Sequence, residues 1–215
     1  MFSLESFQKQ YQTDTTEVVV DEHRFHLFVP KTIDSFIDPL DPLQNFPLWS
    51  KIWQASLVLA DYLAHLPVHP DKQFLEIGSG MGLVSIVATH AGHNFTLTEY
   101  DLHALNFARA NARLNKCPKL EIKRLDWFKP NLEEIFDYIV GSEVLYKKAC
   151  FPPLLKLFKQ SLKSDGEIIL VGEPRKTDLA FYKMMDPSFR IKVQKKTLRS
   201  ANIEIRVNQI NMTFK

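Results

Sequence analysis

The chain has 215 residues, of which 45% are hydrophobic, and its formal net charge is +2. That length and apolar content suit one sizeable α/β domain, so we expect a single domain over residues 1–215. The net charge does not demand a polyanionic partner, although residues 1–76 carry 5 Lys and Arg against 11 Asp and Glu and the remainder carries 22 against 14.

An N-terminal extension is predicted over residues 1–70. Glu17–Val20 and Arg24–Val29 alternate apolar and polar side chains, a pattern typical of the two strands of a hairpin. From about residue 49 to 66, apolar residues recur at helical spacing, which predicts an amphipathic helix.

From residue 71 onward, strand patterns alternate with helix patterns. This alternation requires crossovers and therefore a parallel sheet covered on both faces. The end of the chain differs, because Phe189–Gln194 and Ile203–Phe214 alternate in the manner of an antiparallel pair. The predicted parallel strands are 73–78, 94–99, 119–124, 135–141 and 166–172, and the predicted helices are 81–91, 102–115, 151–163 and 176–185.

The most informative pattern is a set of alternate glycines directly after the first predicted strand: Gly78, Gly80 and Gly82. Glycines at a strand-to-helix turn let backbone N–H groups approach a ligand closely, because no Cβ intervenes. A dinucleotide fingerprint places its third glycine five positions after the first, where this chain has Leu83. The spacing indicates a nucleotide-type ligand and argues against an NAD(P)-linked oxidoreductase.

Acidic and aromatic residues follow the next two strands. Glu99 ends the second strand and can accept both hydroxyls of a ribose, whereas Asp101 suits the N-cap of the next helix. The sequence leaves open which of the two binds the ribose. After the third strand, Asp126 can accept an adenine amino group and Trp127 can cover the base.

The acid-x-G-x-G-x-G arrangement that begins at Glu76 resembles motif I of the class I (seven-β-strand) S-adenosylmethionine-dependent methyltransferases. The fourth strand runs into GSEVLY at the same edge of the predicted sheet. Together with LWSKIWQAS, TEYDLHALNFARANARLN and the LDW triplet, these motifs resemble one branch over roughly residues 45–175. That branch is the methyltransferase-like protein-lysine methyltransferases, which include enzymes acting on Hsp70, valosin-containing protein and the electron-transfer flavoprotein β subunit.

The resemblance implies a Rossmann-like α/β fold with a mostly parallel seven-stranded sheet in the order 3-2-1-4-5-7-6 and helices on both faces. The hairpin and helix of residues 1–70 would extend a core of residues 71–215. The implied cofactor is S-adenosyl-L-methionine, with S-adenosyl-L-homocysteine as product. Taken with the motifs above, the cofactor-binding residues are expected to be Trp53, Glu76, Gly78, Ser79, Gly80, Gly82, Glu99, Asp126, Trp127 and Ser142.

The resemblance also implies that a D/E-x-x-Y element, here Glu143 to Tyr146, lies at the catalytic mouth; many relatives have Asp at the first position. A lysine nucleophile must lose a proton, since its unperturbed pKa is about 10.4. Glu143 could hold the incoming ammonium by a charge-assisted hydrogen bond, and Tyr146 could pack against it or accept a hydrogen bond. Water could carry the proton away. We therefore expect a protein-lysine N-methyltransferase.

Other functions remain to be weighed. A small-molecule amine or another metabolite stays open as the methyl acceptor. Nucleic-acid base methylation is disfavoured, because the fourth strand leads into Gly-Ser-Glu-Val rather than Asp/Asn-Pro-Pro-aromatic, and Cys150 follows Ala149 rather than a proline. No Tyr-x-x-x-Lys supports an oxidoreductase. A non-catalytic module is the least favoured, because the glycine motif is intact. Glu173-Pro174-Arg175 could border the substrate.

The two cysteines, Cys117 and Cys150, have neither metal-ligand nor disulfide spacing, so we expect no metal site and a reducing compartment. The first residues lack the basic and apolar segments of a signal peptide, and no apolar run approaches transmembrane length. We therefore expect a cytoplasmic protein without a membrane partner, and a monomer.

Overall fold

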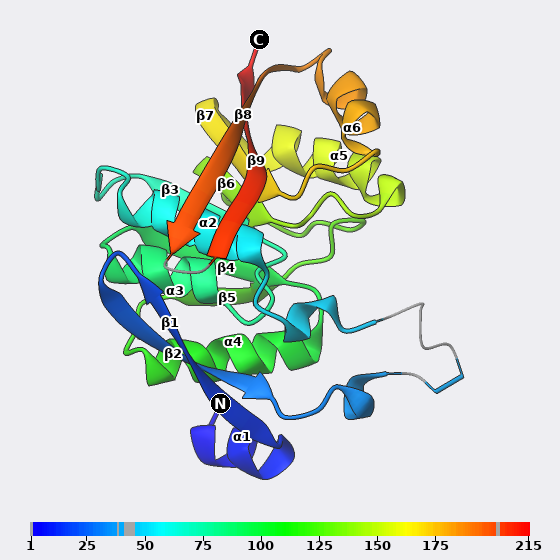
Figure 1. Cartoon of the computed structure of the whole chain (residues 1–215). Coiled ribbons are helices and arrows are strands. Elements are labelled where there is room, and N and C mark those ends of the chain that lie inside the picture. The colour runs from blue at the N-terminus through cyan, green and yellow to red at the C-terminus, as the bar shows by residue number, and fades with distance from the viewer. Residues whose placement is uncertain (1, 38, 41–45, 201–202) are drawn as a thin grey trace.

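The computed structural model describes residues 2–37, 39–40, 46–200 and 203–215, and its centre is a seven-stranded sheet (Figure 1). The strand order is β5-β4-β3-β6-β7-β9-β8, which confirms the predicted order 3-2-1-4-5-7-6 when counting starts at β3. Strands β3 to β7 pair in parallel, and β9 pairs antiparallel with both β7 and β8. The strands are β3 Gln73–Ile77, β4 Asn94–Glu99, β5 Glu121–Arg124, β6 Phe136–Ser142, β7 Leu162–Gly172, β8 Phe189–Ser200 and β9 Ile203–Phe214.

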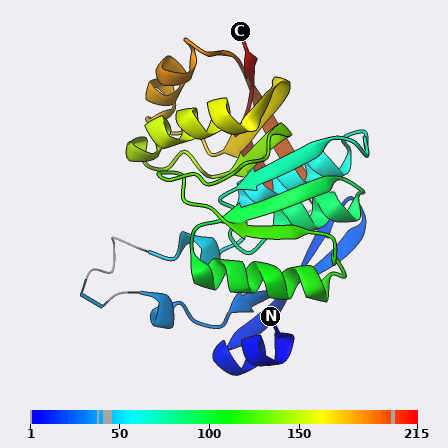
Figure 2. The same ribbon diagram turned by 180° about the vertical axis from the view of Figure 1, so that it is seen from behind.

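Helices cover both faces of this sheet (Figures 1 and 2). Right-handed crossovers place α3 and α4 on one face, together with α2, and α5 on the other, together with α6. Alternation along β3 sends Phe74 into the core under α2 and α3, and sends Leu75 and Ile77 into the core under α5. The helices are α2 Gln54–Ala64, α3 Leu83–His90, α4 Leu102–Leu114, α5 Phe151–Ser161 and α6 Asp178–Met185.

The N-terminal extension packs on the core through aromatic rings. Its hairpin, β1 Thr13–Val20 and β2 His23–Pro30, confirms the predicted one and is longer at both outer ends. A short helix that we did not predict, α1 Leu4–Gln10, precedes it, with Ser3 as its N-cap. The Phe7 ring of α1 meets Phe107 of α4 edge-on, with ring centroids 5.0 Å apart. Seven residues are too few for helical periodicity to stand out in the sequence, which is why α1 was missed.

The bounds of two further elements differ clearly from the prediction. The helix expected over 49–66 begins only at Gln54, because Leu48–Ser50 forms a 3₁₀ turn (η2) and the chain is extended at Trp53. Strand β8 runs to Ser200 rather than Gln194, as an edge strand that is rich in basic residues, a composition that discourages edge-to-edge association.

None of the helices in the described part of the chain is long and apolar enough to cross a membrane.

At the amino ends of the central strands, one buried carboxylate joins three segments. Asp137 of β6, 4% exposed, accepts hydrogen bonds from Lys72 Nζ at 2.8 Å, the Gln73 N–H at 2.9 Å and Lys163 Nζ at 2.9 Å. Lys163 reaches it because the pairing of β6 with β7 shifts register beside Phe136. Burial opposes ionisation of Asp137, but these donors outweigh it and lower its pKa to about 2.

This depressed pKa predicts acid sensitivity. Because the folded pKa of about 2 lies below the ordinary value of 3.8, the stabilisation is complete above pH 4 and is lost as the pH falls through 2. Asp137→Asn should lower the free energy of unfolding by about 2 kcal/mol at pH 6 and by much less near pH 2. Denaturant unfolding of both proteins across this range measures the difference.

Asp186→Asn is the matched control, because the Asp186 carboxylate is 71% exposed and its ion pair, with Lys215 at 3.3 Å, lies on the surface. Such a surface pair contributes roughly 0–1 kcal/mol. A cost of Asp137→Asn that does not change between pH 6 and pH 2 would contradict the assigned ionisation.

Candidate active site

The loop from Gly78 to Gly82 follows β3, at the edge where the carboxyl ends of the parallel strands meet. Its three glycines have positive φ, +61°, +54° and +90° in chain order, which L-residues with a side chain rarely adopt. Space is also tight at two of them: a Cβ at Gly78 would lie 3.1 Å from Trp127 Cζ2, and one at Gly82 would lie 2.9 Å from Leu97 Cδ1. At Gly80 a Cβ would make an ordinary contact, 3.4 Å from the Trp49 carbonyl oxygen, so glycine is required there by conformation alone.

Glu76 supports this loop from inside the protein. The side chain is 1% exposed and faces α3, where its carboxylate accepts hydrogen bonds from the Ser85 N–H at 3.0 Å and from the Ser85 hydroxyl. Burial raises the pKa of Glu76 to about 8, against the lowering effect of Ser85. The motif predicts a cofactor-binding role for Glu76, and these contacts show that it also holds the start of α3.

Glu99 holds the same loop from the end of the neighbouring strand, β4. One carboxylate oxygen accepts the Gly80 N–H at 2.9 Å, and the other accepts the N–H groups of Tyr100 and Asp101 at 2.6 and 3.1 Å. Burial raises the pKa of Glu99, and these three donors partly offset the rise. Glu99 is thus fixed beside the glycine loop, as its place at a strand end predicts.

Asp101 has the capping role that we expected for it. Its Oδ1 accepts the N–H groups of His103 and Ala104 at 2.7 and 3.0 Å and so N-caps α4. The capping gives Asp101 a structural role, whereas Glu99 bonds the glycine loop itself, so Glu99 stays the predicted ribose ligand.

Asp126 and Trp127 follow β5 at the same edge. Asp126 Oδ1 accepts the Phe128 N–H at 2.9 Å, which fixes a tight turn and directs the loop. The Trp127 ring lies over Gly78, and it also packs against the core under α5. The structure therefore brings Gly78, Glu99 and Trp127 together from three strands.

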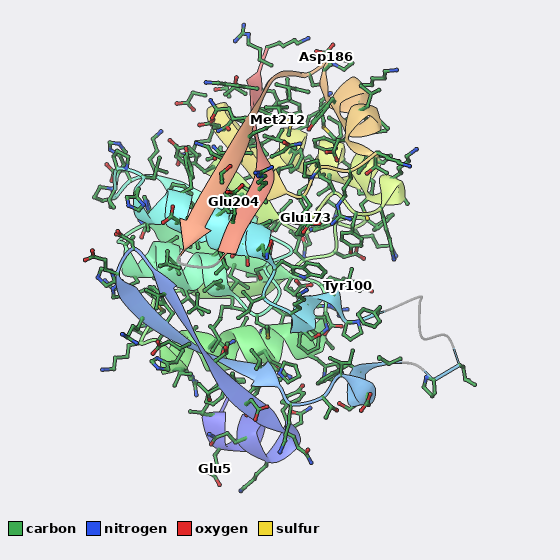
Figure 3. The ribbon with its side chains drawn as sticks, viewed as in Figure 1. Glu5, Tyr100, Glu173, Asp186, Glu204 and Met212 are labelled. Carbon is green, nitrogen blue, oxygen red and sulfur yellow. The ribbon has the colours of Figure 1, made fainter. Side chains whose placement is uncertain are left out.

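The element after β6 adds Ser142, Glu143 and Tyr146 to this edge. Glu143 has φ +54°, unusual for a residue with a side chain, and its N–H still bonds the Val171 carbonyl of β7 at 2.9 Å. Burial raises the pKa of Tyr146, and the charges of Cys150 and Glu99 add to the rise, so its phenol stays protonated at neutral pH. Val144 of this element reaches the glycine loop, because a Cβ at Gly78 would lie 3.2 Å from its Cγ1. Tyr100 and Glu173, labelled in Figure 3, follow β4 and β7 at this edge.

Trp53 lies in the segment that crosses the glycine loop. Its indole N–H donates to the Leu48 carbonyl at 2.8 Å, and Lys51 Nζ lies 4.9 Å from the ring centroid. The residue of this segment that approaches Gly80 is Trp49, whose backbone would meet a Cβ there. Trp53 stays a predicted cofactor-binding residue, and the contact of Trp49 with the loop is one that the sequence did not reveal.

Sequence reasoning also missed the partners of these residues. Asn111, fully buried in α4, donates to the Met81 carbonyl at 3.1 Å and accepts the Phe28 N–H at 2.7 Å, which connects the glycine loop to the hairpin. Ser85 bonds Glu76, and Arg175 pairs with Glu143. Only Arg175 had a signal in the sequence, its place just after a strand end.

The raised pKa of Glu76 gives a second prediction. Between its ordinary value of 4.5 and about 8, the folded chain keeps a proton that the unfolded chain loses. This group therefore makes the free energy of unfolding decline as the pH rises through that window, by up to about 1.4 kcal/mol per pH unit. In Glu76→Gln the decline should be smaller, as measured by denaturant unfolding at pH 5, 6, 7 and 8.

Glu5→Gln serves as the control, because Glu5 lies on the exposed face of α1, where it forms an ion pair with Lys9 at 2.7 Å (Figure 3). Its pH profile should follow that of the wild type. If the Glu76→Gln profile ran parallel to the wild type from pH 5 to 8, the carboxyl would not be protonated in the folded chain.

Comparison with known proteins bears on this site. A family model described as lysine methyltransferase matches residues 46–188. The protein N-lysine methyltransferase METTL21A of Xenopus tropicalis is 35% identical over 148 residues, 65% of this chain and 68% of that protein. The histone-arginine methyltransferase METTL23 of Rattus norvegicus is 32% identical over 111 residues, 48% of this chain and 49% of that protein.

Solved structures agree on the fold. The precorrin-6y C5,15-methyltransferase of Geobacter metallireducens GS-15 superposes with a TM-score of 0.60 at 16% identity, over 74% of this chain and 87% of that chain. The family model spans well over half of this chain and includes the glycine loop, the strand-end acids and the element from Glu143 to Tyr146. The chain therefore belongs to the lysine methyltransferase family of the class I S-adenosylmethionine-dependent methyltransferases.

Proposed function

We propose that this enzyme transfers a methyl group from S-adenosylmethionine to a lysine side chain of a protein. The observation that carries the proposal is the joining, at one sheet edge, of a glycine loop bonded to Glu99 with the Glu143–Tyr146 element. Membership of the family supports the reaction class. The name of the METTL21A relative supports lysine on a protein as the acceptor.

The loop fits the proposed cofactor. Gly78 and Gly80 carry no side chain that would cover the loop backbone, and the buried Ser79 hydroxyl has no hydrogen-bond partner among the described residues. Glu99 would accept a ribose hydroxyl at Oε2, because the Gly80 N–H is its one backbone donor there and a lone pair remains. When bound, S-adenosylmethionine supplies a methyl group activated on a sulfonium.

The remaining assignments follow from the positions of the side chains. Asp126 would accept the adenine amino group and Trp127 would cover the base, next to Gly78. Trp53 and Ser142 would line the same pocket, and Gly82 would close the loop as the N-cap of α3. Glu76 would act from below by fixing the loop rather than by touching the ligand.

Glu143 and Tyr146 would receive the acceptor. The Glu143 carboxylate would hold the lysine ammonium by a charge-assisted hydrogen bond, and the neutral Tyr146 phenol would pack beside it or accept a hydrogen bond. The proton would leave to water before attack. Alignment of the reactants can contribute up to ~7–11 kcal/mol, so the main task of these residues is positioning.

We further propose that the enzyme works as a monomer in the cytoplasm. Its cysteines, Cys117 and Cys150, are free and buried, which suits a reducing compartment.

Cofactor binding is the first test of the proposed function. Titration calorimetry should show that the wild type binds S-adenosylmethionine and S-adenosylhomocysteine. Glu99→Gln should weaken binding at least about tenfold, because a hydrogen bond to a charged group contributes about 1.5–3 kcal/mol. The absence of binding to either compound would overturn the assignment.

Asp101→Asn is the matched variant, because asparagine caps a helix as well as aspartate does. Its affinity should equal that of the wild type. A weakened Asp101→Asn with an unaffected Glu99→Gln would instead assign the ribose to Asp101.

Acceptor chemistry is the second test. With labelled S-adenosylmethionine and host lysate, the wild type should label a discrete protein band, and mass spectrometry should locate the methyl group on lysine. Glu143→Gln should bind the cofactor with nearly unchanged affinity yet transfer label at least about tenfold more slowly, since a neutral amide holds an ammonium less well.

Glu5→Gln, which changes an exposed carboxylate on α1, should transfer label at the wild-type rate. Label only in the small-molecule fraction would show a metabolite acceptor, and a methyl group on arginine would refute the lysine assignment. An unaffected Glu143→Gln would remove that residue from the mechanism.

A further inference from the structure

The carboxylate of Glu143 is held at both oxygens by the segment that follows β7. Its Oε1 accepts the Glu173 N–H at 2.8 Å, and its Oε2 accepts Nη2 of Arg175 at 2.5 Å. The Glu143 side chain is 9% exposed and that of Arg175 is 35% exposed. An ion pair with one partner this well buried differs from a solvated surface pair, in which each side chain moves freely.

Arg175 is itself anchored by its backbone. Its N–H donates to the Asp178 carboxylate at 3.0 Å, and its carbonyl accepts the Asp178 N–H at 3.1 Å. This reciprocal turn leads into α6 and fixes the point from which the guanidinium reaches Glu143. The arginine is therefore placed by a rigid element and not by a free loop end.

The backbone of Glu143 makes such an anchor necessary. At φ +54° the residue turns sharply after β6, and a left-handed conformation is costly for a residue with a side chain. The two bonds from Glu173 and Arg175 direct the side chain of this turn onto the end of β7. A carboxylate has about four lone-pair sites, so two remain for an incoming cation.

We propose that Arg175 is a positioning residue for methyl transfer: it fixes the carboxylate of Glu143 in the orientation that receives the acceptor ammonium. This inference rests on the proposed function, because it needs Glu143 at the acceptor. A displacement of about 1 Å in a catalytic group can cost about 100-fold in rate, so release of the carboxylate should slow transfer without affecting the cofactor. Arg175 acts through Glu143 and touches neither reactant.

The test compares label transfer into lysate protein by wild type, Arg175→Met, Arg175→Lys, Glu143→Gln and the double variant Glu143→Gln with Arg175→Met, all at saturating labelled S-adenosylmethionine. Arg175→Met should slow transfer at least about tenfold. Arg175→Lys, which keeps one donor, should recover part of the rate. The double variant should be no slower than Glu143→Gln alone, because Arg175 has no effect without its partner. Cofactor affinity by calorimetry should be the same in all five proteins.

Arg24→Met is the matched control, because it removes another Arg–Glu pair, with Glu17 at 2.6 Å, on the exposed N-terminal hairpin. It should leave the rate unchanged. Thermal unfolding shows which variants fold. If Arg175→Met does not fold, Arg175→Lys takes its place: it should slow transfer relative to the wild type but cause no further slowing when Glu143→Gln is also present.

Each other outcome has one meaning. An Arg175→Met enzyme that is as fast as the wild type, or faster, would overturn the inference and show that the pair restrains Glu143 instead. A double variant slowed by the product of the two single effects would show that Arg175 acts independently of Glu143. If the wild type labels no protein, the proposed function fails and the role of Arg175 fails with it, whereas the other failures leave the proposed function standing.

Discussion

Two acidic side chains, the buried Glu76 and the half-buried Glu99, hold the loop on which the candidate site depends. Glu76 binds the first turn of α3 from beneath, through Ser85, and Glu99 binds the Gly80 N–H from the next strand. A loop of three glycines with positive φ has high conformational entropy when unfolded, so it needs such constraints to keep one shape. The hydrogen bonds are local, but the neighbouring strands bring their donors and acceptors into range.

The same loop couples the N-terminal extension to the core. Met81 lies in the aromatic cluster that contains Phe7 and Phe107, and its carbonyl accepts a hydrogen bond from Asn111, which also bonds Phe28 of the hairpin. The backbone of Trp49 crosses Gly80 from the other side. The extension thus surrounds part of the glycine loop, which the alternating pattern of its hairpin does not reveal in the sequence.

Periodicity predicted which segments form strands, and the resemblance to the class I methyltransferases supplied their order. The residues at the strand ends could be placed together from the sequence because parallel strands bring their carboxyl ends to a common edge. Pairings between distant side chains could not be predicted. Nothing in the sequence connects Glu76 with Ser85 or Glu143 with Arg175, since each pair depends on the register of packing between elements. The contact of Trp49 with the glycine loop could not be predicted for the same reason, because a 3₁₀ turn and not a helix carries that residue.

The Asp137 cluster has a consequence for how this fold diversifies. It binds Lys72, Gln73 and Lys163 at the amino ends of the strands, away from the loops that carry the glycines, Glu99 and Glu143. These anchoring contacts lie at one end of the sheet, and the candidate site lies at the other. The loops at the candidate site can therefore change in sequence without breaking the contacts of Asp137. A related protein could in this way acquire a different methyl acceptor and keep the same fold.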